Sequence, residues 1–154
     1  MKVSKFIIIE NIVPELKANN KTEVLKELAG VVTSNSSNLN YQKTLEALQE
    51  RESLCSTAMD EGVAIPHGKL HGISNIIIAF GKSSKGIDFD SLDNKPTFLF
   101  IMLLSPEDSS KQHIQALAKI SYIFKKNKFR DDILKSDNAE EILEFITEED
   151  ESKE

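Results

Sequence analysis

The sequence predicts a single α/β (α+β) domain in which α-helices flank both faces of a mixed β-sheet. Two apolar runs, Ile76–Phe80 and Thr97–Leu104, are continuous rather than alternating, which is typical of strands that are covered on both faces. Segments with helical periodicity lie between and after these runs, so that helices and strands are interspersed along the chain. The chain of 154 residues is long enough for one domain with a sizeable core. We expect this domain to span residues 5–147.

The first half of the chain predicts one strand followed by two helices. Residues 5–13 are expected to form the strand, which ends at Pro14. Thr22 is expected to cap a helix over residues 22–33, whose apolar residues recur at helical spacing. A second helix is expected over residues 41–52, which would place an arginine close to its C-terminal end.

The second half of the chain predicts three helices after the apolar run Thr97–Leu104. Capping residues and early acids precede a helix expected over residues 109–126. Two shorter helices are expected over residues 127–135 and 138–148. Residues 148–154 are expected to form an acidic, disordered tail.

Polar segments and proline are expected to interrupt the strands. Pro66 lacks a backbone donor, so that regular strand pairing should stop there. The segment Lys69–Asn75 is predicted to be a polar turn, and Gly81–Gly86 is predicted to be a loop.

The charge of the chain is uneven. The formal net charge is −6, but residues 140–154 alone carry −7, so that the rest of the chain carries +1. The chain contains no basic stripe with interleaved aromatic residues, and it is therefore not expected to bind nucleic acid. The acidity belongs to the last helix and the tail.

The cysteine content and the N-terminus favour a cytoplasmic protein. Cys55 is the single cysteine, so that no internal disulfide is possible. The uninterrupted apolar run Phe6–Ile9 is too short for a signal-peptide core or a membrane span. We expect no direct membrane insertion.

The segment Gly62–Gly68 is the first candidate functional site. Its apolar residues suit a short buried strand, and Pro66 holds the residue before it in an extended conformation. Gly68 has no Cβ, so that backbone or a ligand can approach His67 closely. These features predict that His67 is held at a strand end and faces a cleft.

His113 and Arg51 are the other candidate residues. His113 lies in line with the apolar stripe of the helix over residues 109–126, so that it is expected to point inward. Arg51 lies near a helix C-terminus, where the helix dipole favours a cation. The ordinary interpretation of His113 is a core histidine, and that of Arg51 is a cation that caps a helix. Sequence spacing alone does not show that these two residues lie near His67.

Two glycines, Gly81 and Gly86, have the spacing of a phosphate-binding loop. That motif continues with lysine and serine or threonine, whereas this chain continues with Ile87 and Asp88. The lysine that would reach the phosphates is missing, and a nucleoside triphosphatase of this type is excluded.

A metal site and a cysteine nucleophile are the remaining alternatives. His67 and His71 have the spacing of two ligands on one helix face, but proline and glycine neighbours disfavour a helix there, and no third ligand lies nearby. Cys55 with His67 would be a nucleophile and its base, yet the residues around Cys55 match no signature of a cysteine enzyme. We expect neither a metal nor a cofactor.

An imidazole and a guanidinium are suited to phosphoryl transfer. Imidazole is a competent nucleophile at pH 7, and the transition state spreads negative charge over three oxygens. A second imidazole, a guanidinium and a helix N-terminus would stabilise that charge.

Four motifs together resemble one known family. They are Arg51-Glu52-Ser53 with Ser56-Thr57, Gly62-Val63-Ala64-Ile65-Pro66-His67-Gly68, Gly86-Ile87-Asp88-Phe89-Asp90, and Pro106 followed by His113 and Leu117-Ala118. Over residues 5–147 the chain is similar to the enzyme IIA domains of the phosphoenolpyruvate-dependent phosphotransferase system (PTS), of the fructose/mannitol/nitrogen-regulatory type. The resemblance also implies a mixed sheet between helices.

The resemblance implies a phosphotransferase component with a phosphohistidine intermediate and no cofactor. His67 would accept a phosphoryl group from phospho-HPr and donate it to a cysteine of an enzyme IIB partner, with His113 and Arg51 flanking the group. His71 and Cys55 depart from the family pattern, and no role is assigned to them.

Two functions remain open within the family. The chain is either a phosphocarrier for the uptake of a fructose- or mannitol-type sugar, or a nitrogen-regulatory protein whose phosphorylation state controls binding to partner proteins. A binding domain without activity is a third possibility, against which the joint presence of Arg51, His67 and His113 argues.

Overall fold

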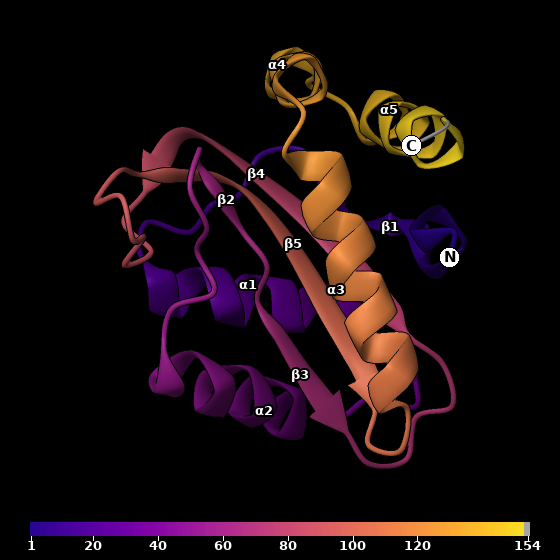
Figure 1. The fold of residues 1–154 in the computed structure, drawn as a ribbon. Helices are drawn as coiled ribbons and strands as arrows, with labels where there is room; N and C mark the ends of the chain where they lie inside the picture. Colours follow the sequence, from indigo (N-terminus) through magenta and orange to yellow (C-terminus); the bar gives the residue numbers. More distant parts are fainter. Residues whose placement is uncertain (153–154) are drawn as a thin grey trace.

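The computed structural model describes residues 1–152, which form three layers with a five-stranded sheet in the middle (Figure 1). After a short 3-10 helix at Val3–Phe6, the strands are β1 (Ile7–Val13), β2 (Val63–Ala64), β3 (His67–Leu70), β4 (Ile77–Ile87) and β5 (Thr97–Pro106). The helices are α1 (Lys21–Ser34), α2 (Tyr41–Leu54), α3 (Ser110–Phe124), α4 (Asn127–Lys135) and α5 (Ala139–Glu151). The predicted α/β class is confirmed.

The sheet is mixed, as predicted. Its order is β1-β4-β5-β2, and β3 also pairs with β5. Strand β4 pairs antiparallel with β5, whereas the other pairs are parallel. Strands β2 and β3 lie one after the other along the same edge of β5 and are separated by Ile65 and Pro66, where pairing stops as expected. His67 begins β3 opposite Leu103.

The continuous apolar run of β5 is buried on both faces. Leu99, Ile101 and Leu103 belong to a core formed with α3, α4 and α5. Phe100 and Met102 belong to a second core formed with α1 and α2. Because successive strand residues point to opposite faces, one uninterrupted run contributes to both cores.

Each helix begins at the predicted residue or one residue from it. The side chain of Asn20, rather than Thr22, caps α1 by accepting a hydrogen bond from the backbone N–H of Glu23 at 2.9 Å. Asn40 caps α2 in the same way through Lys43. Asparagine supplies the cap because its short side chain reaches the free N–H groups of the first turn.

The loop predicted at Gly81–Gly86 is wrong, because β4 continues through this segment to Ile87. Gly81 pairs with Phe100 and Lys82 with Leu99. The Lys82 side chain is buried, and its ammonium group donates to the carbonyls of Leu134 and Ser136 at the end of α4. A polar residue is tolerated inside the sheet here because distant carbonyls satisfy its donors.

The turn predicted at Lys69–Asn75 begins later, since β3 includes Lys69 and Leu70.

The last helix ends later than predicted. Helix α5 extends to Glu151, so that residues 148–151 of the expected tail are helical. Residues 153–154 of that tail lie outside the described residues.

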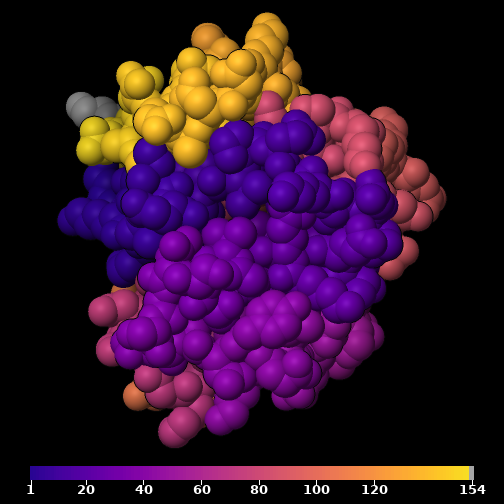
Figure 2. Space-filling view, turned by 180° about the vertical axis from the view of Figure 1, so that it is seen from behind, coloured from indigo at the N-terminus to yellow at the C-terminus, as the bar shows by residue number. Residues whose placement is uncertain are grey.

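The C-terminal helix packs against the N-terminus (Figure 2). Asp150 is 1% exposed, and its Oδ2 accepts hydrogen bonds from the backbone N–H of Ser4 at 2.9 Å and from the Ser4 hydroxyl at 2.7 Å. Lys119 of α3 lies 3.8 Å from the other carboxylate oxygen. Helix α5 is thereby linked to the N-terminal segment and to α3.

Among residues 1–152, none of the helices combines the length and the apolar character that a membrane crossing requires.

Candidate functional site

The structure brings Arg51, His67 and His113 together from three elements. Arg51 lies in the last turn of α2, His67 is the first residue of β3, and His113 lies in the first turn of α3. The Nε of Arg51 lies 3.1 Å from Nε2 of His67, and the two imidazole rings have their centroids 5.3 Å apart at an interplanar angle of 59°.

The two neighbours of the His67 ring assign its tautomer. Nδ1 lies 2.8 Å from the carbonyl oxygen of Ile65, which can only accept a hydrogen bond. Nε2 faces the guanidinium of Arg51, which can only donate. Both contacts therefore require the proton on Nδ1 and the lone pair on Nε2.

His113 is held from the sheet side. It is 7% exposed, and its Nδ1 lies 2.6 Å from the hydroxyl oxygen of Ser105, which is fully buried at the end of β5. The hydroxyl can donate to Nδ1, which leaves the proton of a neutral ring on Nε2. His113 points inward, as its place in the apolar stripe predicts.

The environment keeps both rings neutral at pH 7. Burial lowers the pKa of His113 to about 4, with further lowering by the nearby His67 and Lys69. Burial also lowers the pKa of His67; the Ile65 carbonyl opposes this, Arg51 adds to it, and Glu52 opposes it. A neutral His67 presents the Nε2 lone pair, which a nucleophile requires.

Helix α2 approaches β3 closely because residue 68 is glycine. A Cβ built on Gly68 would lie 3.2 Å from the Cβ of Ala47 and 3.3 Å from its backbone carbon. The sequence left open whether backbone or a ligand approaches at this glycine; in the structure the backbone of α2 does. The contact places Arg51, one turn further along α2, beside His67.

An open cleft of about 510 Å³ lies over the three residues. Its walls come from α2, β3 and α3, and Lys69 adds a second cation. Leu54, at the end of α2, also lines the cleft and is 78% exposed. The site thus combines cationic groups with an exposed apolar rim, as a surface for a protein partner would.

Sequence reasoning missed the groups that hold the two rings. Ser105 was part of the segment expected to start a helix, but it ends β5 and binds His113. The Ile65 carbonyl carries no signal, because its direction depends on the backbone path at Pro66.

The other candidates lie apart from the cleft or show no metal-type arrangement. His71 is exposed, and its Nδ1 lies 3.2 Å from Oε2 of Glu107. Cys55 is exposed; its carbonyl accepts from Nη1 of Arg51 at 2.8 Å, and its Sγ lies 3.8 Å from the same atom. Within the part of the chain that the structure describes, no group of three or more His, Cys, Asp or Glu residues could hold a metal ion.

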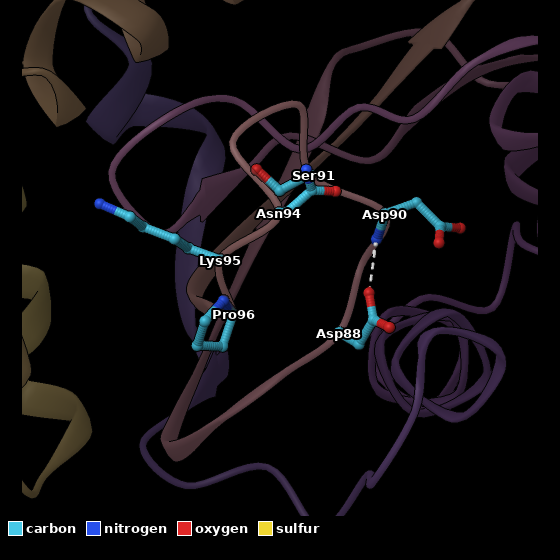
Figure 3. A pocket seen from close by; sticks show the side chains of 6 residues that line it. All are labelled: Asp88, Asp90, Ser91, Asn94, Lys95 and Pro96. Atoms are coloured by element: carbon cyan, nitrogen blue, oxygen red, sulfur yellow. Dashed lines mark hydrogen bonds between the residues drawn. The ribbon is translucent and has the colours of Figure 1, made fainter.

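A second hollow, of about 330 Å³, lies in the connection between β4 and β5 (Figure 3). The backbone N–H of Asp90 donates to Asp88 at 3.0 Å, and Lys95 points away from both aspartates. No histidine or arginine lines this hollow. The residues predicted for the chemistry all lie at the first cleft.

Comparisons with known proteins found a family model and sequence relatives that match most of the chain. The family model described as "Phosphoenolpyruvate-dependent sugar phosphotransferase system, EIIA 2" matches residues 5–149. A nitrogen regulatory protein of Bradyrhizobium diazoefficiens is 35% identical over 146 residues, covering 95% of each chain. The fructose-specific EIIABC component of Bacillus subtilis is 31% identical over 150 residues, which are 97% of this chain but only 24% of that longer protein.

A solved structure shares the fold over nearly its whole length. The nitrogen regulatory protein IIA-Ntr from Neisseria meningitidis superposes with a TM-score of 0.88 at 30% sequence identity, covering 94% of this chain and 99% of the other.

Proposed function

Because the chain belongs to the EIIA type 2 family of the phosphoenolpyruvate-dependent sugar phosphotransferase system, we propose that it carries a phosphoryl group on Nε2 of His67. The observation that supports this most directly is the tautomer of His67. Its Nδ1 proton is bound to the Ile65 carbonyl, so that the lone pair on Nε2 faces the cationic side of an open cleft.

The proposed step exchanges one phosphorus–nitrogen bond for another. The Nε2 lone pair of His67 attacks the phosphorus of a phosphohistidine on an HPr-type donor. The Nε2–P bond forms as the donor's P–N bond breaks, and that electron pair returns to the donor imidazole. The His67 ring gains positive charge, which the Ile65 carbonyl at Nδ1 stabilises.

Arg51 stabilises the phosphoryl group in this proposal. In the described structure its Nε occupies the lone pair of His67 Nε2, and its Nη1 is held by the Cys55 carbonyl. Nε and Nη2 then turn from the ring nitrogen to the phosphoryl oxygens as the donor enters. A guanidinium is suited to this exchange because it stays charged and offers several donors in one plane.

His113 donates a hydrogen bond to the same oxygens. Its Nδ1 accepts from Ser105, so that Nε2–H is the free donor of a neutral ring. After transfer, the negative phosphoryl group raises the pKa of both histidines and strengthens this bond. Neither a metal nor a cofactor takes part, since protein groups supply all of the positive charge.

The phosphoryl group then passes to a cysteine of an enzyme IIB partner. The thiolate attacks phosphorus, an S–P bond forms, and the electron pair of the broken Nε2–P bond returns to His67. In this role the chain is a cytoplasmic phosphocarrier that supports the uptake of a fructose- or mannitol-type sugar. The named fructose-specific relative is consistent with that role.

A regulatory role is the second candidate, and a specific observation favours it. The relative that matches over 95% of both chains and the structure with a TM-score of 0.88 are both named nitrogen regulatory proteins. In this form, phosphorylation of His67 adds negative charge in the cleft and changes which partner protein binds there.

Intact-mass spectrometry tests the phosphoryl carrier. After incubation with phosphoenolpyruvate, enzyme I and HPr, we expect one phosphoryl group that is labile in acid and stable in base. The group should be absent from His67→Ala and present in the control His71→Ala, because His71 is exposed outside the cleft. An adduct on serine, or none in the wild-type chain, would refute the proposal.

Transfer assays distinguish the two roles. The phosphorylated chain is incubated with candidate enzyme IIB proteins, and loss of the group from His67 is followed by mass. Rapid loss to a IIB cysteine supports sugar uptake. Retention of the group, together with a partner that binds only one phosphorylation state, supports the regulatory role.

A further inference from the structure

Glu52 is a buried carboxylate directly after Arg51 in the last turn of α2. Its side chain is 4% exposed. Oε2 accepts from the backbone N–H of Thr57 at 3.2 Å, and Oε1 accepts from the Thr57 hydroxyl. The ammonium group of Lys21 lies 2.9 Å from Oε2. A buried charge is costly unless it is paired and hydrogen-bonded, and these three contacts satisfy it.

Thr57 continues the connection toward His67. The backbone N–H of Ile65 donates to the Thr57 carbonyl at 3.1 Å, and the Ile65 carbonyl accepts from Nδ1 of His67 at 2.8 Å. Ile65 lies in the gap between β2 and β3, where the ladder with β5 is interrupted. The contact with Thr57 therefore fixes the N–H side of Ile65, the residue whose carbonyl binds His67, at a position where strand pairing is interrupted.

Other contacts hold the residues on either side of Thr57. Ser56 donates from its hydroxyl to the Phe89 carbonyl at 2.6 Å, and Ala58 forms an isolated bridge with Ala64. Helix α2 ends at Leu54, so that residues after it lack helical hydrogen bonds. Arg51 binds this segment through the Cys55 carbonyl, and Glu52 is the side chain of α2 that binds it at Thr57.

We propose that Glu52 is a positioning residue that acts through Thr57 and Ile65 to hold His67 in its Nδ1–H tautomer. The role rests on the proposed phosphoryl transfer at His67, and it extends that function to a residue that touches neither the ring nor the phosphoryl group. One carboxylate fixes the ends of two elements, α2 with Arg51 and the β2–β3 gap with the Ile65 carbonyl. The imidazole of His67 and the guanidinium of Arg51 are thereby held in a fixed position relative to each other.

The charge of Glu52 also balances the field at His67. Arg51 lowers the pKa of His67 and Glu52 raises it, while Glu50, Lys69 and His113 are the other titratable groups that line the cleft. Removal of the negative charge leaves Arg51 uncompensated, so that the pKa of His67 falls further. The ring then becomes a weaker base and a weaker nucleophile.

Two variants and two controls test the role. Glu52→Gln keeps the shape, but its NH2 group faces a donor at either Thr57 or Lys21. Thr57→Val removes only the hydroxyl. Thr57→Ser restores the hydroxyl and is the rescue variant. Glu46→Gln removes one carboxylate from an exposed position of α2 and is the matched charge control.

The first measurement is long-range ¹H–¹⁵N NMR of the His67 imidazole in the full chain. We expect a single Nδ1–H tautomer in the wild type, Thr57→Ser and Glu46→Gln, and a mixture of tautomers in Glu52→Gln and Thr57→Val. The rate of phosphoryl uptake from phospho-HPr should fall by about 10–100-fold in Glu52→Gln and less in Thr57→Val. A lower pKa of His67 in Glu52→Gln is the accompanying signature.

Two outcomes overturn the inference. An unchanged His67 tautomer and pKa in both Glu52→Gln and Thr57→Val would show that the ring is held without them. An equal effect in Glu46→Gln would show that net charge alone is responsible. If the tautomer changes as expected but the wild-type chain accepts no phosphoryl group, the positioning role holds and the proposed function fails.

Discussion

The two histidines lie at one cleft, but their hydrogen-bond partners favour different tautomers. Each ring has its Nδ1 held by an oxygen, the Ile65 carbonyl for His67 and the Ser105 hydroxyl for His113. A carbonyl requires a proton on the ring nitrogen, whereas a hydroxyl can supply one. The first arrangement leaves a lone pair on Nε2 of His67, which accepts from Arg51, and the second leaves a donor on Nε2 of His113.

The lowered pKa of His113 predicts a loss of stability in acid. Its pKa is about 4 in the folded chain and about 6.5 when unfolded, so that the unfolded state binds more protons between these values. The stability that a neutral His113 contributes is therefore fully present above about pH 6.5, and it is lost as the pH falls toward 4. We expect the free energy of unfolding to decrease by about 2 kcal/mol between pH 7.5 and 5.0, as measured by urea denaturation.

The variant His113→Gln is the control for this pH dependence. It keeps a polar side chain but does not titrate, so that its stability should change less between pH 7.5 and 5.0 than that of the wild type. An identical pH dependence in the two proteins would mean that carboxylates or His67, whose pKa is also lowered, account for the effect.

The contact between α2 and β3 sets the distance between Arg51 and His67. Gly68 is the residue that permits it, since the helix backbone at Ala47 lies against its Cα. The sequence predicts a glycine suited to close approach, but it does not say whether backbone or ligand approaches. Only the packed structure identifies α2.

Replacement of Gly68 by alanine should separate the two elements. The added Cβ would lie 3.2–3.4 Å from Ala47, including its backbone, so that α2 has to move by a few tenths of an ångström. We expect a loss of about 1–3 kcal/mol in urea unfolding and slower phosphoryl uptake. In the control Gly30→Ala, no atom lies within 4 Å, and α1 should gain about 0.5–1 kcal/mol. Equal stability of Gly68→Ala and the wild type would contradict this account.

Strand β4 shows why local signals fail for some elements. Gly81–Gly86 contains glycine, serine and lysine, which favour a loop when read alone. In the fold, a Cβ at Gly81 would lie 2.8 Å from Leu16, so that the glycine serves packing between neighbouring segments. The partners of Lys82 lie 52 and 54 residues away in the sequence. Tertiary contacts therefore override the local propensity.

The ends of the described chain meet across the molecule. Lys2 donates to the Asp150 carbonyl at 3.2 Å, and Ser4 binds the Asp150 carboxylate. Lys126 lies 2.6 Å from Glu149. Within the segment expected to be a tail, Glu149 and Asp150 are therefore partners of distant donors.

Deletion of residues 148–154 should consequently destabilise the whole domain. Ser4 would lose two bonds to a buried carboxylate, and α5 would lose its last turn. We expect a loss of about 2–4 kcal/mol in urea unfolding. Deletion of residues 153–154 alone is the control and should leave stability within about 0.5 kcal/mol. Equal stability of the shorter and the longer deletion would contradict the role of Asp150.

The sequence by itself determined the class of the fold and singled out Arg51, His67 and His113 as the candidate residues of the site. Apolar runs and helical stripes depend on neighbours in the chain, and the motifs around Arg51, His67 and His113 are short and local. The tertiary structure alone decided the convergence of these residues, the His67 tautomer and the contacts of Ser105 and Glu52. Those features depend on contacts between segments far apart in the chain, and no local pattern encodes the direction of the Ile65 carbonyl or the depth of Asp150.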